Sequence, residues 1–456
     1  MSGSKTVFVC QSCGSISPKW LGRCPVCGEY NTIIEEQEEP QLSKPVKNRN
    51  KPQIFSLKEL FESKTINNVE RFSTGMSEFD RVLGGGAVRG SVILLGGEPG
   101  IGKSTLIMQT ASSMSKFLKV FYVTGEESVE QLRIRAERLQ LNNTDFKIVN
   151  ETDLEEIKSI IENEKPEVLI IDSIQTLYNP LMQSSAGSVS QIREITRFLS
   201  NIAKQTGMIV FVIGHITKDG TLAGPKILEH MVDCVLTFEG EEYNSLRILR
   251  TTKNRYGATC EIGVFEMLDT GLREVQDASQ IFLDNSSLAA SGSALSIVLE
   301  GSRPLVVEVQ SLSVFSPMVM PRRVAGGIDY NRLSLISAVL DKMTSANLRN
   351  QEIYTRISGG LRVEEPSIDL AVAVSILSSF YNVPVDRKTV FMGELGLNGF
   401  IKSVRGMDRR LAEAARQSFS YVVTSTSFSK LPEGVSVVKI EHIKDIVNKF
   451  FSVKGA

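Results

Sequence analysis

The sequence has little of several features that would point to particular classes of protein. Its formal net charge is only −1, it contains three histidines and one tryptophan, and no run of eighteen apolar residues occurs. The missing apolar run argues against a membrane-spanning helix, and Met1 to Lys5 lack the apolar core of a signal peptide. We therefore expect a cytoplasmic protein without membrane contact. Any contact with nucleic acid would come from local basic surface rather than from bulk charge.

Cysteine is also scarce, and its distribution is uneven. Four of the six cysteines lie near the amino terminus, whereas Cys234 and Cys260 stand apart. The four form two Cys-x-x-Cys-Gly knuckles, made by Cys10, Cys13, Cys24 and Cys27. Two knuckles supply four thiolates and close a tetrahedral shell, so we expect a structural zinc ion. Iron in a rubredoxin-like site and a redox-active cysteine pair are the alternatives.

The most specific motif is the stretch from Gly97 to Ser104, which matches G-x-x-x-x-G-K-[ST] without a gap. An apolar run at residues 91–96 precedes it and a helical pattern at residues 105–109 follows it. Strand, loop and helix in this order predict a loop whose backbone N–H groups bind phosphate. The expected nucleotide contacts are Gly97, Glu98, Pro99, Gly100, Ile101, Gly102, Lys103, Ser104 and Thr105. Lys103 would reach the β- and γ-phosphates of ATP, and Ser104 would hold magnesium.

Apolar runs and helical patterns alternate after this loop. Strand-like runs occupy residues 119–124, 168–172 and 208–215, with helical patterns at residues 129–139 and 153–163 between them. Continuous apolar strands that alternate with helices predict an α/β fold with a parallel sheet. Such sheets bind ligands at the carboxyl ends of their strands.

Polar side chains follow three of these predicted strands. Asp172 is the candidate carboxylate that helps Ser104 to hold magnesium, and a residue that caps the strand end is the alternative. Glu126 is the candidate base for the attacking water, with Glu127 as the alternate. His215 either senses the γ-phosphate or is a structural histidine.

Three later segments carry candidate binding residues. Lys253 and Arg255 lie at the end of a predicted strand, where two cations suit insertion into the ATP site of a neighbouring subunit. The alternative is a solvated basic turn. Residues 179–190 and 217–226 read as loops that either contact a nucleic-acid backbone or are ordinary surface loops.

A chain of 456 residues is too long for one ordinary core, so we expect several domains. The expected divisions are a four-cysteine module at residues 1–30, a linker at 31–65, an α/β domain at 66–275 and an α+β domain at 285–456. The linker is expected because acidic and then basic runs fill it.

These motifs together resemble the RadA (Sms) family of bacterial DNA repair proteins. The resemblance rests on the cysteine module, the phosphate loop and Lys253-Asn254-Arg255-Tyr256-Gly257, in that order. The family hallmark is Lys-Asn-Arg-Phe-Gly, so Tyr256 replaces a phenylalanine here. Segments 217–220 and 228–233 are also similar to that family.

The resemblance implies a RecA-like ATPase that binds ATP, Mg2+ and Zn2+ and acts in recombination and repair. It further implies a homo-hexameric ring on single-stranded and branched DNA that drives branch migration, with Lys253 and Arg255 acting across the subunit boundary. Recombinases and replicative helicases are the implied protein partners.

The family's third domain is similar to the Lon protease domain, which uses a serine–lysine pair. Ser367 falls at the position of the nucleophile, but Asp408 falls at the position of the lysine. An aspartate supplies no neutral amine to activate the serine, and Arg409 and Arg410 remain protonated. We therefore expect a scaffold, whose arginines are either solvated or bound to DNA phosphates (Arg322, Arg323, Arg405, Arg409 and Arg410). An ATP-dependent peptidase and a non-motor nucleotide switch are the alternative functions.

Overall fold

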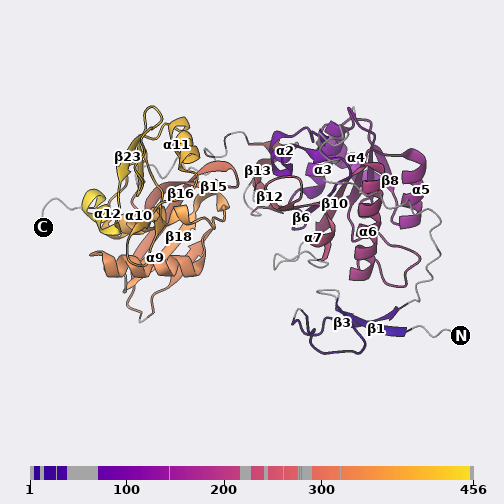
Figure 1. Ribbon diagram of the computed structural model, residues 1–456, viewed down its shortest axis with the longest axis horizontal. Helices are drawn as coiled ribbons and strands as arrows, with labels where there is room; N and C mark the ends of the chain where they lie inside the picture. Colours follow the sequence, from indigo (N-terminus) through magenta and orange to yellow (C-terminus); the bar gives the residue numbers. More distant parts are fainter. Residues whose placement is uncertain are drawn as a thin grey trace, which may run out of the picture. The chain divides into compact units, whose positions relative to one another are not determined.

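A computed structural model of the chain is shown in Figure 1. It describes residues 5–10, 15–26, 28–38, 70–142, 144–215, 227–240, 245–259, 261–275, 277, 279, 290–318 and 320–451. The chain divides into two compact units, Met1–Glu274 and Val275–Ala456.

A small antiparallel sheet forms the amino-terminal module. Its strands β1 (Lys5–Cys10), β2 (Ile16–Ser17) and β3 (Ile33–Glu38) lie in the order β2-β1-β3. Cys10, Cys24 and Ile33 are buried together in its core. The strand β3 lies inside the stretch 31–65 that we expected to be a linker. This is a correction: the acidic residues belong to a strand paired with β1, and the apolar Ile33 anchors it.

A mixed sheet organises the rest of the first unit. Among the described residues its strand order is β14-β13-β12-β11-β6-β10-β9-β7-β8. Parallel pairing joins β11, β6, β10, β9, β7 and β8, whereas β12, β13 and β14 extend the sheet in antiparallel fashion. The strands are β6 (Val92–Gly97), β7 (Val120–Thr124), β8 (Lys147–Asn150), β9 (Val168–Asp172), β10 (Ile209–His215), β11 (Cys234–Glu239), β12 (Leu246–Asn254), β13 (Ile262–Leu268) and β14 (Gly271–Glu274). The predicted parallel strands are thus confirmed, and the antiparallel extension is an addition to them.

Helices cover both faces of this sheet. One core lies between the sheet and α2 (Ser77–Leu83), α3 (Lys103–Met114) and α4 (Val129–Arg138). The other lies between the sheet and α5 (Leu154–Glu164), α6 (Val189–Thr206) and α7 (Ile227–Met231). Neighbouring residues of a strand alternate between the two cores, so Tyr122 packs on the α3 side and Val123 on the other. A short pair, β4 (Arg71–Phe72) with β5 (Ala87–Val88), flanks α2.

The first helix of this fold is capped by the last residue of the unit. Met76 precedes α2 and has no side-chain oxygen to accept from the free N–H groups of the first turn. The carboxylate of Glu274 takes that role, because its Oε1 accepts from the Glu78 N–H (2.6 Å) and the Ser77 hydroxyl (3.0 Å). A negative charge at a helix amino terminus is also favoured by the helix dipole.

The second unit is built on a seven-stranded sheet of order β17-β18-β16-β15-β19-β22-β23. Its strands are β15 (Ser293–Glu300), β16 (Arg303–Phe315), β17 (Arg323–Gly326), β18 (Gln351–Ile357), β19 (Thr389–Phe391), β22 (Tyr421–Thr424) and β23 (Ser436–Lys439), with the hairpin β20 (Glu394–Leu395) and β21 (Ile401–Lys402) beside it. Its helices are α9 (Tyr330–Met343), η2 (Ser358–Gly360), η3 (Pro366–Ile368), α10 (Asp369–Tyr381), α11 (Met407–Arg416) and α12 (Ile443–Phe450). Strands and helices confirm the predicted α+β class of this part.

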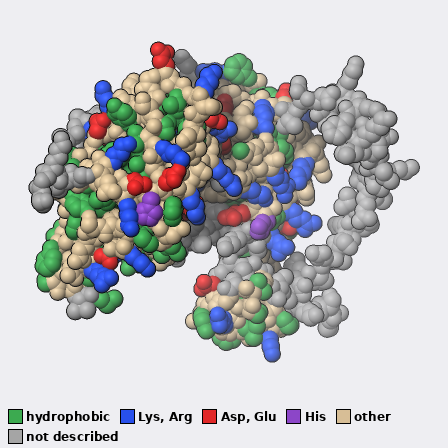
Figure 2. Space-filling model, turned by 60° about the vertical axis from the view of Figure 1, so that its left-hand side comes forward, with side chains coloured by type: hydrophobic (Ala, Val, Ile, Leu, Met, Phe, Trp, Pro, Cys, Tyr) green, Lys and Arg blue, Asp and Glu red, His purple; other side chains and the backbone are tan. Residues whose placement is uncertain are grey.

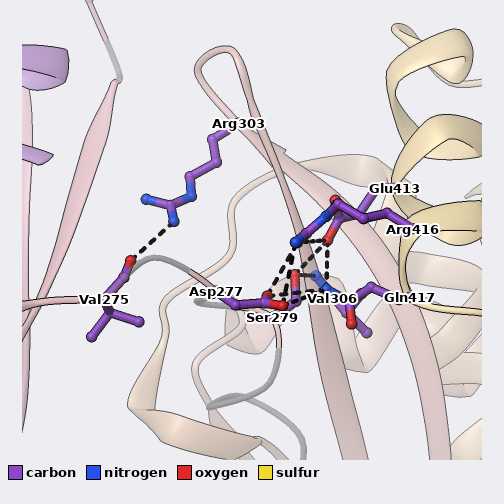
Figure 3. A network of polar contacts seen from close by, with 8 residues as sticks. All are labelled: Val275, Asp277, Ser279, Arg303, Val306, Glu413, Arg416 and Gln417. Atoms are coloured by element: carbon purple, nitrogen blue, oxygen red, sulfur yellow. Dashed lines mark hydrogen bonds and ion pairs between the residues drawn. The ribbon is translucent and has the colours of Figure 1, made fainter. Parts of the chain in front are cut away.

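Residues just after Glu274 belong to the second unit, earlier than the expected start at residue 285. Figure 3 shows how they are held. The Asp277 carboxylate accepts from Arg416 Nη2 (3.1 Å) and Gln417 Nε2 (3.0 Å) on and beside α11. The buried Ser279 hydroxyl donates to Glu413 Oε1 (2.8 Å) and accepts from the Val306 N–H (3.2 Å).

Charged and hydrophobic side chains are mixed on the face of the molecule that is drawn in Figure 2. Figure 2 shows Lys and Arg side chains on the visible face, interspersed with acidic and hydrophobic ones, as a net charge of −1 would suggest. Within the described residues, no helix combines the length and the hydropathy needed to cross a membrane.

Candidate active site

The predicted phosphate loop connects β6 to α3. Gly102 precedes the helix with φ 114°, a left-handed conformation that glycine adopts without strain. A Cβ at Gly102 would also meet the Met267 side chain at 2.5 Å. No side chain of the described residues caps the start of α3, so its first N–H groups remain open to an anion. The loop therefore fits a bound phosphate.

Lys103 is the first residue of α3 and is only 4% exposed. Its Nζ donates to the carbonyl oxygens of Gly97 and Glu98, both at 2.8 Å. Burial lowers its pKa, and the nearby carboxylates of Asp172, Glu126 and Glu98 act in the opposite direction. The ammonium group thus lies among acceptors that a phosphate oxygen would replace.

Asp172 ends β9 and is 4% exposed. Burial raises its pKa, whereas hydrogen bonds from the hydroxyls of Tyr122 and Ser104 lower it. Ser104 follows Lys103 on α3, so the hydroxyl and the carboxylate that we predicted to hold magnesium lie together. Two oxygen ligands at the foot of a phosphate loop fit the hard cation Mg2+.

The two consecutive glutamates after β7 have different partners. Glu126 Oε1 accepts from the Ser173 hydroxyl, next to Asp172. Glu127 Oε1 accepts from Arg135 Nη2 on α4. Burial raises the pKa of Glu127, and Arg135 opposes that effect. Both glutamates follow the carboxyl end of β7, at the same ends of the parallel strands as the phosphate loop after β6.

A cavity of about 780 Å³ opens beside these groups. The phosphate loop and the two glutamates line it, together with Arg138, Arg247 and the β13–β14 hairpin. Its lining comprises Pro99, Gly100, Gly102, Lys103, Ser104, Thr105, Glu126, Glu127, Arg135, Arg138, Arg247, Met267, Leu268, Asp269 and Gly271. The cavity is of the size typical for small ligands and cofactors.

Lys253 and Arg255 lie elsewhere in the unit. Lys253 Nζ donates to the carbonyl oxygens of Glu229 and Val232, and Arg255 Nη1 forms an ion pair with Asp233 at 2.9 Å. The other oxygen of Asp233 accepts from the Val92 N–H, where β6 begins. The phosphate loop follows the opposite end of β6, about 20 Å away for a strand of six residues. Neither cation lines the cavity among the residues described for it.

Some predicted residues can be placed only in part. His215 ends β10 in register with Gly97, and its side chain lies outside the described residues. The same holds for Cys13, Cys27 and the loop 217–226. Cys10 Sγ lies 3.2 Å from Thr32 Oγ1, and Cys24 Sγ lies 3.1 Å from Ser15 Oγ. The loop 179–190 is anchored by Gln191, which bonds the backbone of Asn179 and Ser184.

Ser367, the residue at the expected position of a peptidase nucleophile, contacts Arg410 rather than Asp408. Ser367 is fully buried, and its hydroxyl donates to Glu365 Oε2 at 2.9 Å. Arg410 Nη1 donates to the same hydroxyl at 3.1 Å, and its Nη2 pairs with Glu365. Asp408 is exposed on the other side of α11. Arg410 is also fully buried, so its expected availability to DNA phosphates is wrong.

Sequence reasoning missed three polar residues of the site. Tyr122 bonds Asp172, Ser173 bonds Glu126, and Arg135 bonds Glu127. Ser173 directly follows Asp172, and Tyr122 carries the only hydroxyl-bearing ring in β7, so both signals were present in the sequence. Arg135 lies on α4 among other charged residues and has no distinguishing signal.

The central sheet, the phosphate loop and the carboxylates at the same sheet edge define a RecA-like phosphate-loop ATPase. The chain is 44% identical over 455 residues to the DNA repair protein RadA of Bacillus subtilis (strain 168), covering 98% of both chains. It is 46% identical over 457 residues to RadA of Streptococcus pyogenes serotype M1, covering 99% of this chain and all of that one. The chain therefore belongs to the RadA family of DNA repair proteins.

Three family models match separate parts of the chain. Residues 8–35 match a rubredoxin metal binding domain, residues 68–221 match an AAA domain, and residues 336–427 match subunit ChlI of Mg-chelatase. The predicted fold class, with a zinc ribbon, a RecA-like core and a Lon-protease-like domain, is confirmed.

Solved structures resemble the chain more weakly. A KaiC-like protein from Pyrococcus horikoshii OT3 is 21% identical, with a TM-score of 0.38, covering 46% of this chain and 100% of that one. The RadB recombinase is 23% identical, with a TM-score of 0.35, covering 45% and 99%. Such scores are too low to carry an argument about function.

Proposed function

We propose that this protein is a DNA-dependent ATPase that acts as a ring on single-stranded DNA and promotes branch migration of recombination intermediates. The observation that carries the ATPase part is the cavity that is lined by the phosphate loop, including Lys103 and Ser104, and by Glu126. Membership of the RadA family carries the DNA part.

Two roles in hydrolysis fall to residues beside the phosphate loop of the same subunit. Lys103 would exchange the carbonyls of Gly97 and Glu98 for oxygens of the β- and γ-phosphates. Glu126, oriented by the Ser173 hydroxyl, would accept the proton of the attacking water. Glu127 is less suited to this role because its partner is the charged guanidinium of Arg135, which acts to lower the pKa of the carboxylate.

Ser104 and Asp172 would hold magnesium, and Asp172 is kept at that position by its hydroxyl partners. When bound, magnesium supplies positive charge against the phosphate oxygens. The burial of Asp172 strengthens such electrostatic interactions, because water is largely excluded from it.

A second copy would complete the site. Lys253 and Arg255 lie at the far end of β6 from their own phosphate loop, so within one subunit they serve no bound nucleotide. In a closed ring such a surface can meet the loop of the next subunit. We therefore assign both cations to the neighbour's γ-phosphate, as in arginine fingers, and we assign a hexamer as the assembly.

The amino-terminal module would bind zinc through Cys10, Cys13, Cys24 and Cys27. The two described cysteines are buried in one core with Ile33, which suits a closed structural site rather than a reactive one. Such a module would serve as an adaptor for DNA or for a partner of the recombination or replication machinery.

The test is the ATPase rate with and without single-stranded DNA. Single-stranded DNA should raise the rate, and Lys103→Ala should abolish turnover in both conditions. Lys116→Ala is the matched control, because this lysine is exposed just beyond α3. A rate that DNA leaves unchanged, with no retention of DNA at moderate salt, would instead indicate a nucleotide switch.

A further inference from the structure

The phenol of Tyr122 contacts Asp172, one of the two residues that we propose to hold magnesium. Tyr122 belongs to β7, which pairs with β9 so that Tyr122 is opposite Ile170 and Thr124 is opposite Asp172. Residues two apart in a strand share a face, so Tyr122 and Asp172 project toward α3. Tyr122 is 0% exposed and packs in the core on that face. Its hydroxyl is therefore delivered to Asp172 by the register of the two strands.

The Asp172 carboxylate is bonded from two sides. The Tyr122 hydroxyl donates to Asp172 Oδ2, and the Ser104 hydroxyl of α3 supplies a second side-chain hydrogen bond. The phenol is the donor in this contact, because an ionised carboxylate can only accept. Because the terminal torsion of an aspartate has a broad minimum, loss of the Tyr122 donor would leave only the Ser104 hydroxyl to fix the orientation of the carboxylate.

We infer that Tyr122 is a positioning residue of the ATPase site, whose hydroxyl fixes the Asp172 carboxylate in the orientation that magnesium requires. The inference rests on the proposed function of Ser104 and Asp172. Tyr122 does not line the nucleotide cavity, so it acts through Asp172 alone. Mutation of a partner that orients a metal ligand commonly lowers metal affinity about 10- to 100-fold, and we expect an effect in the same range here.

The experiment compares the full-length protein with Tyr122→Phe, which keeps the ring and removes only the hydroxyl. Binding of a fluorescent ADP is titrated with Mg2+, so that no turnover is needed for the readout. The half-saturating Mg2+ concentration should rise about 10- to 100-fold. Binding of the same nucleotide in EDTA should stay unchanged, and excess Mg2+ should restore kcat.

Two controls separate positioning from a merely structural role. Thr110→Val removes a buried hydroxyl of α3 that bonds the Leu106 carbonyl (2.9 Å), and it should leave the Mg2+ titration unchanged. In an Asp172→Asn background, Tyr122→Phe should add no further change.

The outcomes distinguish the inference from the function on which it rests. If the unmodified protein binds ADP with no dependence on Mg2+, the proposed magnesium site itself is wrong. If the unmodified protein depends on Mg2+ and Tyr122→Phe has the same titration curve, only the inference is overturned. Loss of nucleotide binding in EDTA, or an equal effect in the Asp172→Asn background, would also overturn it, because the hydroxyl would then act on the fold.

Discussion

The guanidinium of Arg410 donates a hydrogen bond to the hydroxyl of Ser367 across 3.1 Å, inside the carboxy-terminal unit. A serine that accepts from a permanent cation is not activated as a nucleophile, because its one acceptor, the Glu365 carboxylate, is a weak base paired with that same cation. The same guanidinium pairs with Glu365 and donates from Nε to the Arg405 carbonyl at 3.0 Å. The position of a peptidase centre has thus become a structural ion pair.

Replacing Arg410 by methionine should destabilise the second unit by about 3 kcal/mol, because breaking a buried ion pair leaves one charge without its partner. Arg410 is 0% exposed, whereas Arg409, which precedes it on α11, is exposed. Arg409→Met is therefore the control and should change the free energy of unfolding by less than about 0.5 kcal/mol. Urea unfolding monitors both variants. Equal stabilities of the two variants would contradict the structural role of the pair.

Ser367→Ala tests the absence of peptidase activity directly. Degradation of an unfolded protein substrate in the presence of ATP should be undetectable before and after the substitution. Proteolysis that disappears with Ser367→Ala would restore the peptidase as a function. ATP turnover should be unaffected, since Ser367 lies in the second unit.

Mixing an inactive variant with a less active one tests whether Lys253 acts across the subunit boundary. Lys103→Ala should abolish turnover, and Lys253→Ala should lower it while the monomer remains folded. In a mixed ring, some interfaces combine an intact Lys103 from one subunit with an intact Lys253 from the next. Turnover by the mixture should therefore exceed the sum of the separate variants. A mixture no more active than that sum would contradict the assignment in trans.

Two side chains that hold the start of the second unit should differ in their effect on its stability. Asp277 and its partner Arg416 are 30% and 51% exposed, so Asp277→Ala should cost less than about 1 kcal/mol. Ser279 is 1% exposed, and Ser279→Ala removes partners from Glu413 and the Val306 N–H, at a cost of about 1–3 kcal/mol. Thermal unfolding of both variants checks this order, and the reverse order would show that the exposed pair is the stronger anchor.

Cys234 should resist alkylation at alkaline pH. Burial, with a contribution from Asp233, raises the pKa of this thiol to about 12, and Lys253 opposes the shift. At pH 9 the folded protein keeps the thiol protonated, whereas an unfolded cysteine with a pKa of about 8.5 is largely thiolate. The buried thiol contributes fully to stability below the unfolded pKa of about 8.5, and this contribution is lost as the pH rises toward the folded pKa of about 12. Peptide mapping after iodoacetamide treatment, with and without urea, measures the difference; equal labelling would contradict it.

The phosphate-binding part of the site was predictable because its residues are adjacent in sequence or end a hydrophobic strand. Lys103 and Ser104 belong to one motif, and Asp172 follows an apolar run. The partner of Ser367 was not predictable in the same way. On α11 the residue that faces the sheet is set by the helical period of 3.6, and the structure selects Arg410 rather than Asp408.

Hydrogen bonds between residues that are far apart in the chain could not be predicted from the sequence either. Tyr122 meets Asp172 only because β7 and β9 are neighbours, which the order of strands along the chain does not state. The strand β3 was missed for a different reason. Its acidic residues suggested a solvated spacer, although strand pairing requires only backbone groups and one apolar anchor, Ile33.

The cap that Glu274 provides for α2 has a consequence for how this protein can be divided and recombined. The carboxylate brings the exit of the ATPase fold to the first turn of its opening helix. Domains whose ends meet are those that tolerate excision, insertion into another host and circular permutation. We therefore expect that residues 70–274 can be excised or transferred as one unit. A fragment that ends at this point should include Glu274, because its carboxylate caps α2.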